Sequence, residues 1–239
     1  GGLNRFTDGK FEVFQTQHGL PSDYIRALYE DRDGVLWIGT GGGLSRFKDG
    51  QFNRYTIRNN LPDNVISQIF EDNRGNLWLG SFRGIFRVTK RDLERVADGS
   101  LRTLTSVLYG KADGLNEREC SGLGQPAGWR SRDGRLWFPT INGVAVVDPA
   151  TVKMNPRPPA VVIEDFEADG LSQGLAQSFT IPAGRERYAV YYTAFDYNSP
   201  RRLRFKYKLE GVDKDWVDAG PARKASYGFL PPGKYNFYV

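Results

Sequence analysis

The 239-residue chain has very little of the two side chains that most often build metal and catalytic centres. Cysteine occurs once, at Cys120, so no intrachain disulfide and no cysteine-rich metal site can form. A lone thiol of this kind is expected to serve as a small buried hydrophobe. Histidine also occurs once, at His18, which excludes most zinc sites. We therefore expect no metal, no cofactor and no catalytic residue in this chain.

Long hydrophobic runs are also missing. No apolar stretch is long enough to cross a bilayer. The N-terminal residues do not combine a basic start, an apolar centre and a small-residue cleavage site, so no signal peptide is expected in the chain as given. The repeats within residues 1–150 predict that the chain is part of a longer protein.

An excess of charge of one sign is confined to a short stretch. The formal net charge is +5, but basic and acidic residues are interspersed almost everywhere. Within 199–211, basic residues alternate with apolar ones, which is the pattern of a strand with one wet and one buried face. Nucleic-acid binding needs aromatic residues beside the basic face. Here they point to the opposite face, so no nucleic-acid partner is expected.

Glycine and aromatic residues are abundant, and a glycine-rich stretch is repeated. The chain has 28 glycines and 13% aromatic residues, which favours short strands and tight turns. The stretch EDRDGVLWIGTGGGLSRF (30–47) recurs 41 positions later as EDNRGNLWLGSFRGIFRV (71–88). Residues 1–14 fit the same frame as residues 42–55, and a third copy covers 131–148. A stretch that recurs several times indicates a structural repeat unit rather than a single catalytic loop.

Each copy predicts four short strands separated by turns. Turns at 32–34, 73–75 and 132–134 end in glycine, which accepts a positive φ without penalty. Four strands in a unit of about 40 residues is typical of a propeller blade, whose faces are buried only by neighbouring blades. The residues expected to define the repeat are three tryptophans and five glycines: Trp37, Trp78, Trp137, Gly39, Gly80, Gly43, Gly84 and Gly143.

A phosphate-binding loop and a calcium loop both fit the repeated stretch less well than a turn does. A phosphate-binding loop leads into a helix, whereas the residues after the glycines, 44–47, predict a strand. The start DRDG (31–34) is similar to a calcium loop, but Ser131 replaces the aspartate in the third copy and no glutamate occupies loop position twelve. A turn is the better prediction.

The repeats resemble the two-component regulator propeller repeat. The shared features are the Leu-Pro opening at Leu20-Pro21 and Leu61-Pro62, the core "I…EDxxGxLWiGT" and the following "GGLsRf". The resemblance covers roughly residues 1–150. It implies a β-propeller, here about three four-stranded blades with the first one incomplete. Because such propellers close with more blades, we expect a piece of a longer chain.

The remaining residues resemble a second module. Residues 151–160 contain several prolines and predict a stiff linker. Residues 161–239 are similar to the three-Tyr module that follows such propellers, an immunoglobulin-like sandwich, through 188–200, 205–216 and 225–239. The module normally continues with one more strand, so a C-terminal truncation is expected. The predicted fold is therefore all-β, a partial propeller followed by a sandwich.

The resemblance also implies a function. In this family, propeller and three-Tyr module form the extracytoplasmic sensor of membrane-anchored signalling proteins, often histidine kinases or hybrid kinases. It therefore implies a non-catalytic sensor, located in the periplasm as part of an inner-membrane protein. The implied partners are a small ligand, with an oligosaccharide as one candidate, the remaining blades of the parent chain, and a second copy in a homodimer. The output domain, and the parent's kinase activity, would lie outside these residues.

The ligand site is predicted from topology. Loops between the second and third strands, and between the fourth strand and the next unit, emerge on one face of a propeller, where binding residues gather. The candidates on these loops are Tyr24, Phe82, Arg83, Asn116, Arg118 and Asn142. Phe82 and Arg83 replace Gly41 and Gly42 of the preceding copy, so this copy displays side chains where its neighbour has none.

Two alternative functions stay open. Virginiamycin-type lyases have similar blades, and that chemistry would need His18 together with acidic groups. A pure interaction scaffold is the second alternative, since open strand edges can pair with other chains. Asp165, Glu167 and Asp169 alternate along the first sandwich strand. Paired carboxylates can perform acid–base chemistry, but the wet face of an edge strand explains them better.

Overall fold

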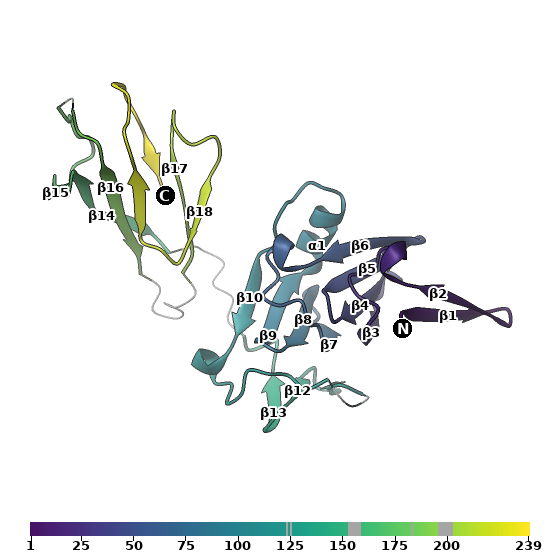
Figure 1. Cartoon of the computed structure of the whole chain (residues 1–239). Coiled ribbons are helices and arrows are strands. Elements are labelled where there is room, and N and C mark those ends of the chain that lie inside the picture. The colour runs from purple at the N-terminus through teal and green to yellow at the C-terminus, as the bar shows by residue number, and fades with distance from the viewer. Residues whose placement is uncertain (123, 125, 153–158, 183, 196–202) are drawn as a thin grey trace. The chain divides into compact units, whose positions relative to one another are not determined.

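The computed structural model of the chain describes residues 1–122, 124, 126–152, 159–182, 184–195 and 203–239 (Figure 1). It divides into two compact units, residues 1–153 and 154–239. Both consist mainly of antiparallel strands, so the predicted β class is confirmed at this level. The predicted linker, 151–160, lies mostly outside the described residues.

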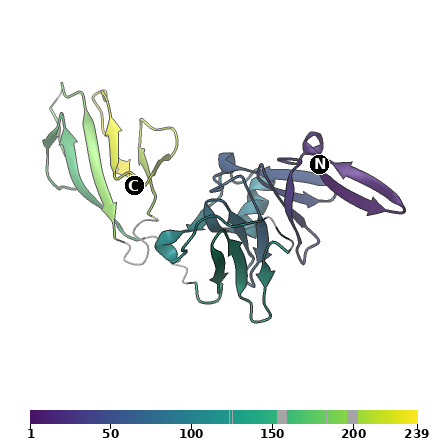
Figure 2. The ribbon, with the colours of Figure 1, turned by 60° about the horizontal axis from the view of Figure 1, so that its bottom comes forward.

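The first unit contains a hairpin and three sheets that follow one another along the chain (Figure 1 and Figure 2). The N-terminal hairpin pairs β1 (Leu3–Thr7) with β2 (Lys10–Phe14). Sheet 1 has the order β3 (Ile25–Glu30), β4 (Leu36–Thr40), β5 (Leu44–Lys48), β6 (Gln51–Tyr55). Sheet 2 has the order β7 (Gln68–Glu71), β8 (Asn76–Ser81), β9 (Gly84–Thr89), β10 (Ser106–Tyr109). Sheet 3 has the order β11 (Trp129–Arg130), β12 (Leu136–Thr140), β13 (Gly143–Val147).

The sequence repeat is visible in the bounds of the elements. The hairpin β1–β2 matches β5–β6 residue for residue at the offset of 41. A short 3-10 helix follows the last strand of the hairpin and of sheets 1 and 2: η1 (Thr16–His18), η2 (Ile57–Asn59) and η3 (Lys111–Asp113). Each ends in a left-handed residue, Gly19, Asn60 or Gly114, which turns the chain toward the next sheet.

An aspartate explains why the motif places tryptophan six residues after the acidic pair. One Asp31 oxygen accepts the backbone N–H groups of Asp33 and Val35, at 2.9 and 3.0 Å, and the other accepts Nε1 of Trp37 at 2.8 Å. Asp72 binds the next turn and Trp78 in the same way, with Trp78 Nε1 at 2.9 Å. The carboxylate therefore fixes the turn and the indole together, in agreement with a turn rather than a calcium loop.

The tryptophans of sheets 1 and 2 are buried between neighbouring sheets. Trp37 packs in a cluster with residues of sheet 2, including Leu77, Leu79 and Phe86. Trp78 packs in a second cluster with Leu136 and Phe138 of sheet 3 and with Cys120. Neither indole is accessible to solvent. The aromatic and aliphatic side chains that are buried between neighbouring sheets thus stabilise the packing of the sheets in this unit.

A helix that the repeat did not predict is inserted in sheet 2. α1 (Lys90–Ala97) lies between β9 and β10, and Thr89 caps it by accepting the N–H of Asp92. It also ties sheet 2 to sheet 1. Arg46 of β5 forms a two-pronged ion pair with Glu94, with contacts of 2.9 Å, and Tyr55 donates to the carbonyl of Leu93 at 3.0 Å.

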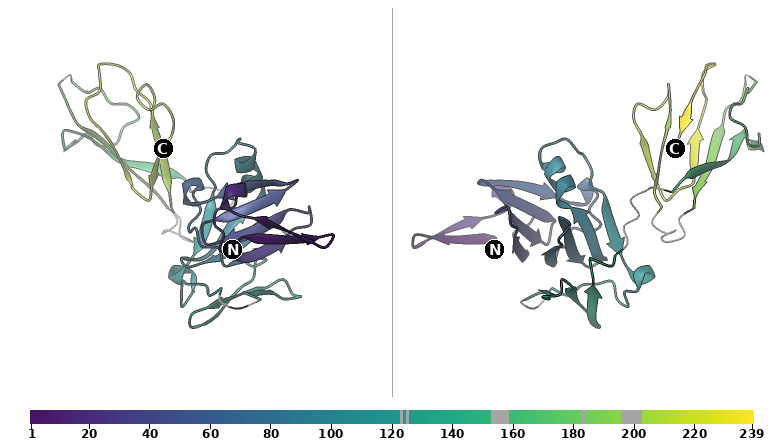
Figure 3. Two further views of the ribbon diagram at one scale, coloured as in Figure 1. Left: turned by 45° about the vertical axis from the view of Figure 1, so that its right-hand side comes forward. Right: turned by 180° about the vertical axis from the view of Figure 1, so that it is seen from behind.

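The two ends of the unit leave apolar side chains exposed. The hairpin projects from the side of sheet 1 opposite to sheet 2 (Figure 1 and Figure 3), and exposes Phe6 and Phe11. Sheet 3 exposes Trp129, Trp137 and Val144. Among the described residues sheet 3 has three strands, whereas the repeat predicts four.

The second unit has two sheets around a shared core. One has the order β15 (Leu171–Ser172), β14 (Val161–Ala168), β16 (Tyr188–Ala194), β19 (Lys224–Tyr227). The other has the order β18 (Val217–Gly220), β17 (Phe205–Leu209), β20 (Phe237–Tyr238). Tyr192 and Phe205 meet in the core with a ring distance of 5.1 Å. Alternating burial along β17 agrees with the strand predicted there.

The three carboxylates predicted on an edge strand hold hairpins together. β14 is flanked by β16 and, at its C-terminal end, by the short β15. Asp165 accepts the hydroxyl of Ser172 at 2.7 Å, and Glu167 accepts that of Tyr191 at 3.0 Å. Asp169 accepts the backbone N–H groups of Glu186 and Arg187, just before β16. Their hydrogen bonds assign them a structural role.

Candidate functional site

An arginine between two exposed aromatic rings joins sheets 1 and 2. The guanidinium carbon of Arg26 lies 4.7 Å from the ring centre of Tyr24 and 5.4 Å from that of Phe82. Tyr24 is 61% exposed and Phe82 is 42% exposed, whereas Arg26 is half-buried. We call these three residues the aromatic cluster. Two of the six predicted ligand residues, Tyr24 and Phe82, therefore both contact Arg26.

The backbone explains how residues so distant in sequence come together. Tyr24 is the last residue of the segment that leads into β3, and Phe82 lies in the turn between β8 and β9. The equivalent turn of sheet 1 contains Gly41 and Gly42. A Cβ on Gly42 would lie 2.6 Å from the carbonyl oxygen of Pro21, so glycine lets the link pack directly on that turn. In sheet 2 Arg83 takes the place of Gly42 and Phe82 that of Gly41, and the ring of Phe82 reaches Arg26.

Arg26 is a candidate that the sequence pattern did not single out. It occupies the position that Ser67 holds one repeat later, so the departure from the repeat is visible in the sequence. Its role depends on the packing of two sheets, which the sequence pattern does not reveal. A guanidinium between aromatic faces is held by attraction to the ring electrons, worth roughly 0.5–1 kcal/mol per exposed contact.

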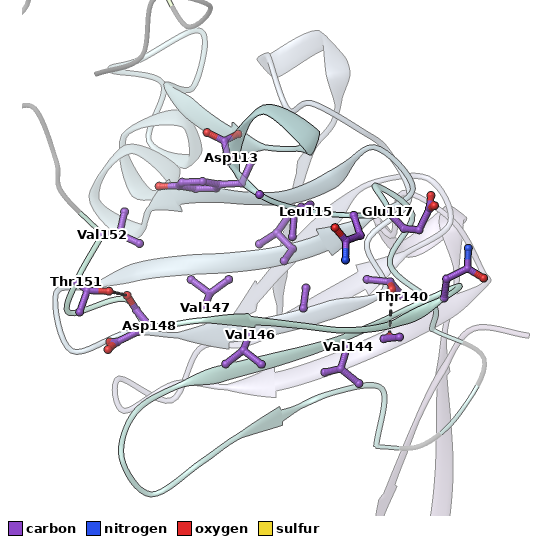
Figure 4. A pocket seen from close by; sticks show the side chains of 17 residues that line it. Asp113, Leu115, Glu117, Thr140, Val144, Val146, Val147, Asp148, Thr151 and Val152 are labelled. Carbon is purple, nitrogen blue, oxygen red and sulfur yellow. Dashed lines mark hydrogen bonds between the residues drawn. The ribbon is translucent and has the colours of Figure 1, made fainter. Parts of the chain in front are cut away.

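The other four predicted residues do not join the aromatic cluster in any contact that the structure describes. Arg83 donates to the carbonyl of Pro62 at 3.2 Å, and Pro62 lies in the segment that leads into β7 of the same sheet. Asn116 and Asn142 both line a different space of about 390 Å³ beside β13 (Figure 4). The carbonyl of Arg118 accepts the thiol of Cys120 at 3.9 Å, a contact that stays within the link into sheet 3.

Three carboxylates at the other end of β3 and β9 from the aromatic cluster are paired with one lysine. Nζ of Lys90 lies 2.7 Å from Asp31, 3.1 Å from Asp33 and 3.1 Å from Glu71. Burial alone would lower the pKa of Lys90, but these carboxylates outweigh it and raise the pKa above its ordinary value. Within the ranges that the structure describes, no group of three or more His, Cys, Asp or Glu side chains could hold a metal ion.

The single histidine has a structural contact. Nδ1 of His18 accepts the backbone N–H of Gln15 at 2.9 Å and so caps η1. Its ring lies edge-on to Phe14, with 6.3 Å between the centres. His18 therefore holds the turn that precedes sheet 1.

Comparison with protein families agrees with the repeat. Residues 19–42 and 60–83 match the two component regulator propeller family, and residues 196–239 match the Y_Y_Y domain. The chain carries two-component regulator propeller repeats and a Y_Y_Y domain. The resemblance inferred from the sequence is confirmed for these segments. The aromatic cluster spans both matched propeller repeats, since Tyr24 lies in the first and Phe82 in the second.

Several solved structures are similar to the chain at low identity. The extracellular domain of a protein named as the hybrid two component system BT3049 from B. thetaiotaomicron is 19% identical, with a TM-score of 0.43 over 95% of this chain and 37% of that one. The corresponding domain of BT4673 is 14% identical, with a TM-score of 0.43 over 95% and 36%. A catalytically inactive virginiamycin B lyase from Staphylococcus aureus, with quinupristin, is 16% identical, with a TM-score of 0.41 over 91% and 62%.

The chain covers only a part of these larger proteins. It spans 37% of the first of these structures, well under two thirds of its length. No curated protein matches the chain. Within the part of the chain that the structure describes, no helix is long and apolar enough to cross a membrane.

Proposed function

We propose that this chain is a non-catalytic part of an extracytoplasmic sensor, which binds a small ligand at the aromatic cluster. The observation that carries the proposal is the exposed Tyr24–Arg26–Phe82 arrangement between two propeller repeats. Single exposed apolar side chains are ordinary on protein surfaces, whereas neighbouring exposed aromatic rings beside a cation form the kind of patch that marks a binding site.

The chemistry of the cluster favours a particular ligand class. Aromatic rings bind the apolar face of a sugar or another flat group, and a guanidinium binds a carboxylate or sulfate through paired hydrogen bonds. Arg26 contacts both rings, so it loses less freedom when a ligand binds than an arginine without such contacts. We propose an acidic sugar, such as a uronic acid at the end of an oligosaccharide, as the ligand.

The architecture that we propose follows the repeat. Sheets 1, 2 and 3 would be adjacent propeller blades, and the N-terminal hairpin would be the outer half of a preceding one. Residues 1–150 would form the propeller part, 151–160 the linker and 161–239 an immunoglobulin-like sandwich. Binding would be relayed through the sandwich to an output domain outside these residues. The site would face the periplasm, as part of an inner-membrane protein.

The experiment measures binding of glucuronate and of glucose to the chain by saturation-transfer NMR. Glucuronate should bind and glucose should bind more weakly, since only the former has a carboxylate for Arg26. Phe82→Ala should weaken glucuronate binding about tenfold or more, in line with the loss of one aromatic contact. Arg26→Met should abolish the preference for glucuronate, because it keeps the length of the side chain without the charge.

Phe11→Ala is the matched control, because Phe11 is an exposed aromatic residue of the same unit outside the cluster. It should leave binding unchanged. Equal binding of both sugars, or equal loss on Phe11→Ala and Phe82→Ala, would contradict the proposal.

The lyase alternative has less support. It depends on His18, whose Nδ1 is engaged by Gln15 in a turn. Incubating the chain with quinupristin and analysing the products by mass spectrometry should give no conversion.

A further inference from the structure

The turns between β4 and β5, between β8 and β9 and between β12 and β13 share one hydrogen-bonded arrangement. In each turn a hydroxyl donates to the carbonyl of a glycine three residues later, and the pairs are Thr40–Gly43 at 2.8 Å, Ser81–Gly84 at 2.8 Å and Thr140–Gly143 at 3.1 Å. The glycine has a positive φ in all three turns, between 134° and 150°. The residue that follows the hydroxyl side chain therefore leaves each turn at an equivalent place.

These equivalent places carry exposed apolar side chains. Phe82 is 42% exposed in sheet 2, and Ile141 is 60% exposed in sheet 3. In sheet 1 the place belongs to Gly41, and Tyr24 lies beside it: a Cβ on Gly41 would be 3.6 Å from Cβ of Tyr24, an ordinary contact. Tyr24 is 61% exposed. We call Tyr24, Phe82 and Ile141 the apolar row, with one member at the turn of each sheet.

A neighbouring sheet does not cover the members of the apolar row. Sheet 2 packs on sheet 1, and sheet 3 packs on sheet 2, through the two core clusters. Tyr24 and Phe82 nevertheless stay exposed beside these interfaces. The exposure of Ile141 is therefore expected from its position in the turn, whatever lies next to sheet 3. Apolar side chains at equivalent turns of adjacent sheets form an extended surface, unlike apolar residues scattered singly.

The spacing of the apolar row determines the size of ligand that fits it. Stacked sheets lie about 10 Å apart, so the two ends of the row are separated by roughly 20 Å. A single sugar ring is shorter than one sheet spacing and can lie against only part of the row. A linear oligosaccharide is long enough to contact all three members, through the apolar faces of successive rings.

Positive charge lies along the first part of the apolar row. Arg26 contacts the rings of Tyr24 and Phe82. Arg83 follows Phe82 directly and is exposed, and its guanidinium donates to the carbonyl of Pro62 at 3.2 Å. A guanidinium has five N–H groups, so Arg83 keeps donors for a carboxylate. The two arginines favour a ligand with acidic groups on more than one of its rings.

We propose that the apolar row binds a linear acidic oligosaccharide whose chain runs across sheets 1, 2 and 3. Its rings contact Tyr24, Phe82 and Ile141, and its carboxylates contact Arg26 and Arg83. The inference rests on the proposed function, because it extends the site at the aromatic cluster. It adds the length of the ligand and two residues, Arg83 and Ile141, that a single acidic sugar at the aromatic cluster does not require.

The test uses the whole chain and β-1,4-linked oligoglucuronates of one to six sugar rings, with binding measured by isothermal titration calorimetry. Affinity should rise with length up to about four rings, which span roughly 20 Å, and then stay constant. Neutral cello-oligosaccharides of the same lengths should bind about tenfold more weakly, because they have no carboxylate for the two arginines.

Substitutions separate the members of the apolar row. Phe82→Ala should weaken binding at every length. Ile141→Ala should weaken binding of the four-ring ligand about threefold and leave glucuronate unchanged, because only the longer chain reaches sheet 3. Arg83→Gln should weaken binding of the four-ring ligand roughly fivefold, again without an effect on glucuronate. Ile57→Ala is the matched control, because Ile57 is 57% exposed but lies in η2, outside the three turns.

The outcomes distinguish this inference from the proposed function. If glucuronate binds and the four-ring ligand binds no more tightly, the proposed function stands and the apolar row is overturned. The same follows if Ile141→Ala and Ile57→Ala have equal effects on the four-ring ligand, since the ligand then does not reach sheet 3. If no glucuronate of any length binds, the proposed function and the apolar row are both overturned.

Discussion

Trp78 and Trp137 occupy the same place in the repeat but have different surroundings. Trp78 is buried between sheets 2 and 3, with Tyr109 stacked on it and Arg87 over its ring at 5.6 Å. Trp137 has neither a following sheet nor a covering tyrosine in the described structure and remains 38% exposed. Its indole still donates to residue 131, at 3.1 Å, as the others donate to aspartate. The motif thus orients the indole, and the neighbouring sheet buries it.

This difference separates two contributions that the sequence motif combines. The hydrogen bond to the turn is local and exists in all three sheets. Burial is a property of the interface, and only Trp37 and Trp78 have it in full. Most of the stability that a repeat tryptophan contributes should therefore depend on its neighbour.

The largest expected effect is the difference between Trp78→Ala and Trp137→Ala. Removing the buried indole should lower the free energy of unfolding by about 3–5 kcal/mol, because it leaves a cavity between two sheets. Removing the exposed one should cost about 1 kcal/mol or less. Urea unfolding followed by far-ultraviolet circular dichroism measures both. Equal losses would mean that the interface does not determine the contribution of the indole.

A smaller effect is expected from the aspartate that binds each buried indole. Burial by itself raises the pKa of Asp72, but hydrogen bonds from Trp78, Asn76 and Arg74 outweigh it and hold the pKa below its ordinary value. The stabilisation is therefore present above the unfolded pKa of about 3.9 and is lost as the pH falls through the folded pKa. Asp72→Asn should cost roughly 2 kcal/mol at pH 7 and less at pH 3.

Ser131→Ala is the control for Asp72→Asn. Its hydroxyl accepts the indole N–H of Trp137 at a partly exposed position and donates to the exposed Asp133, whose pKa it lowers. The loss should therefore be about 1 kcal/mol or less, with a smaller change between pH 7 and pH 3 than for the buried Asp72. Unfolding curves at pH 3, 5 and 7 give the comparison. A loss for Asp72→Asn that does not shrink on acidification would contradict the role of the carboxylate charge.

The repeated strands could be predicted because period and spacing determine them locally. Residues 1–14 align with residues 42–55 at an offset of 41, and this repetition predicted the strands β5 and β6. The turn that ends in glycine predicted the boundary between β8 and β9. α1 was not predicted, since the repeat template led us to expect a strand after β9. Thr89 followed by Asp92, with apolar Leu93 and Val96, was an available signal for a capped helix.

The candidate site could be predicted only in part, for a physical reason. Loop topology and the departure from glycine indicated Tyr24 and Phe82, but the sequence alone gives no contact between sheets. Arg26 is the residue that joins them, and its contacts exist only after sheets 1 and 2 have packed. The exposure of Trp137 is likewise invisible in the motif, because it depends on which neighbour the sheet has.

The smallest effect concerns local opening at sheet 3, reported by Cys120. The thiol is buried in the core between sheets 2 and 3, and burial raises its pKa to about 11, although the contact with Ser81 lowers it slightly. At pH 8 a thiol of this pKa has roughly a hundredfold less thiolate than an ordinary one, and burial slows attack further. The reaction of iodoacetamide with Cys120 in the native chain should therefore be far slower than its reaction with the thiol of free glutathione. Because the outer face of sheet 3 is uncovered, labelling should depend on urea more weakly than global unfolding does. If labelling instead follows global unfolding at every urea concentration, sheet 3 is as firmly held as sheet 2, and an exposed tryptophan does not mark a weaker interface.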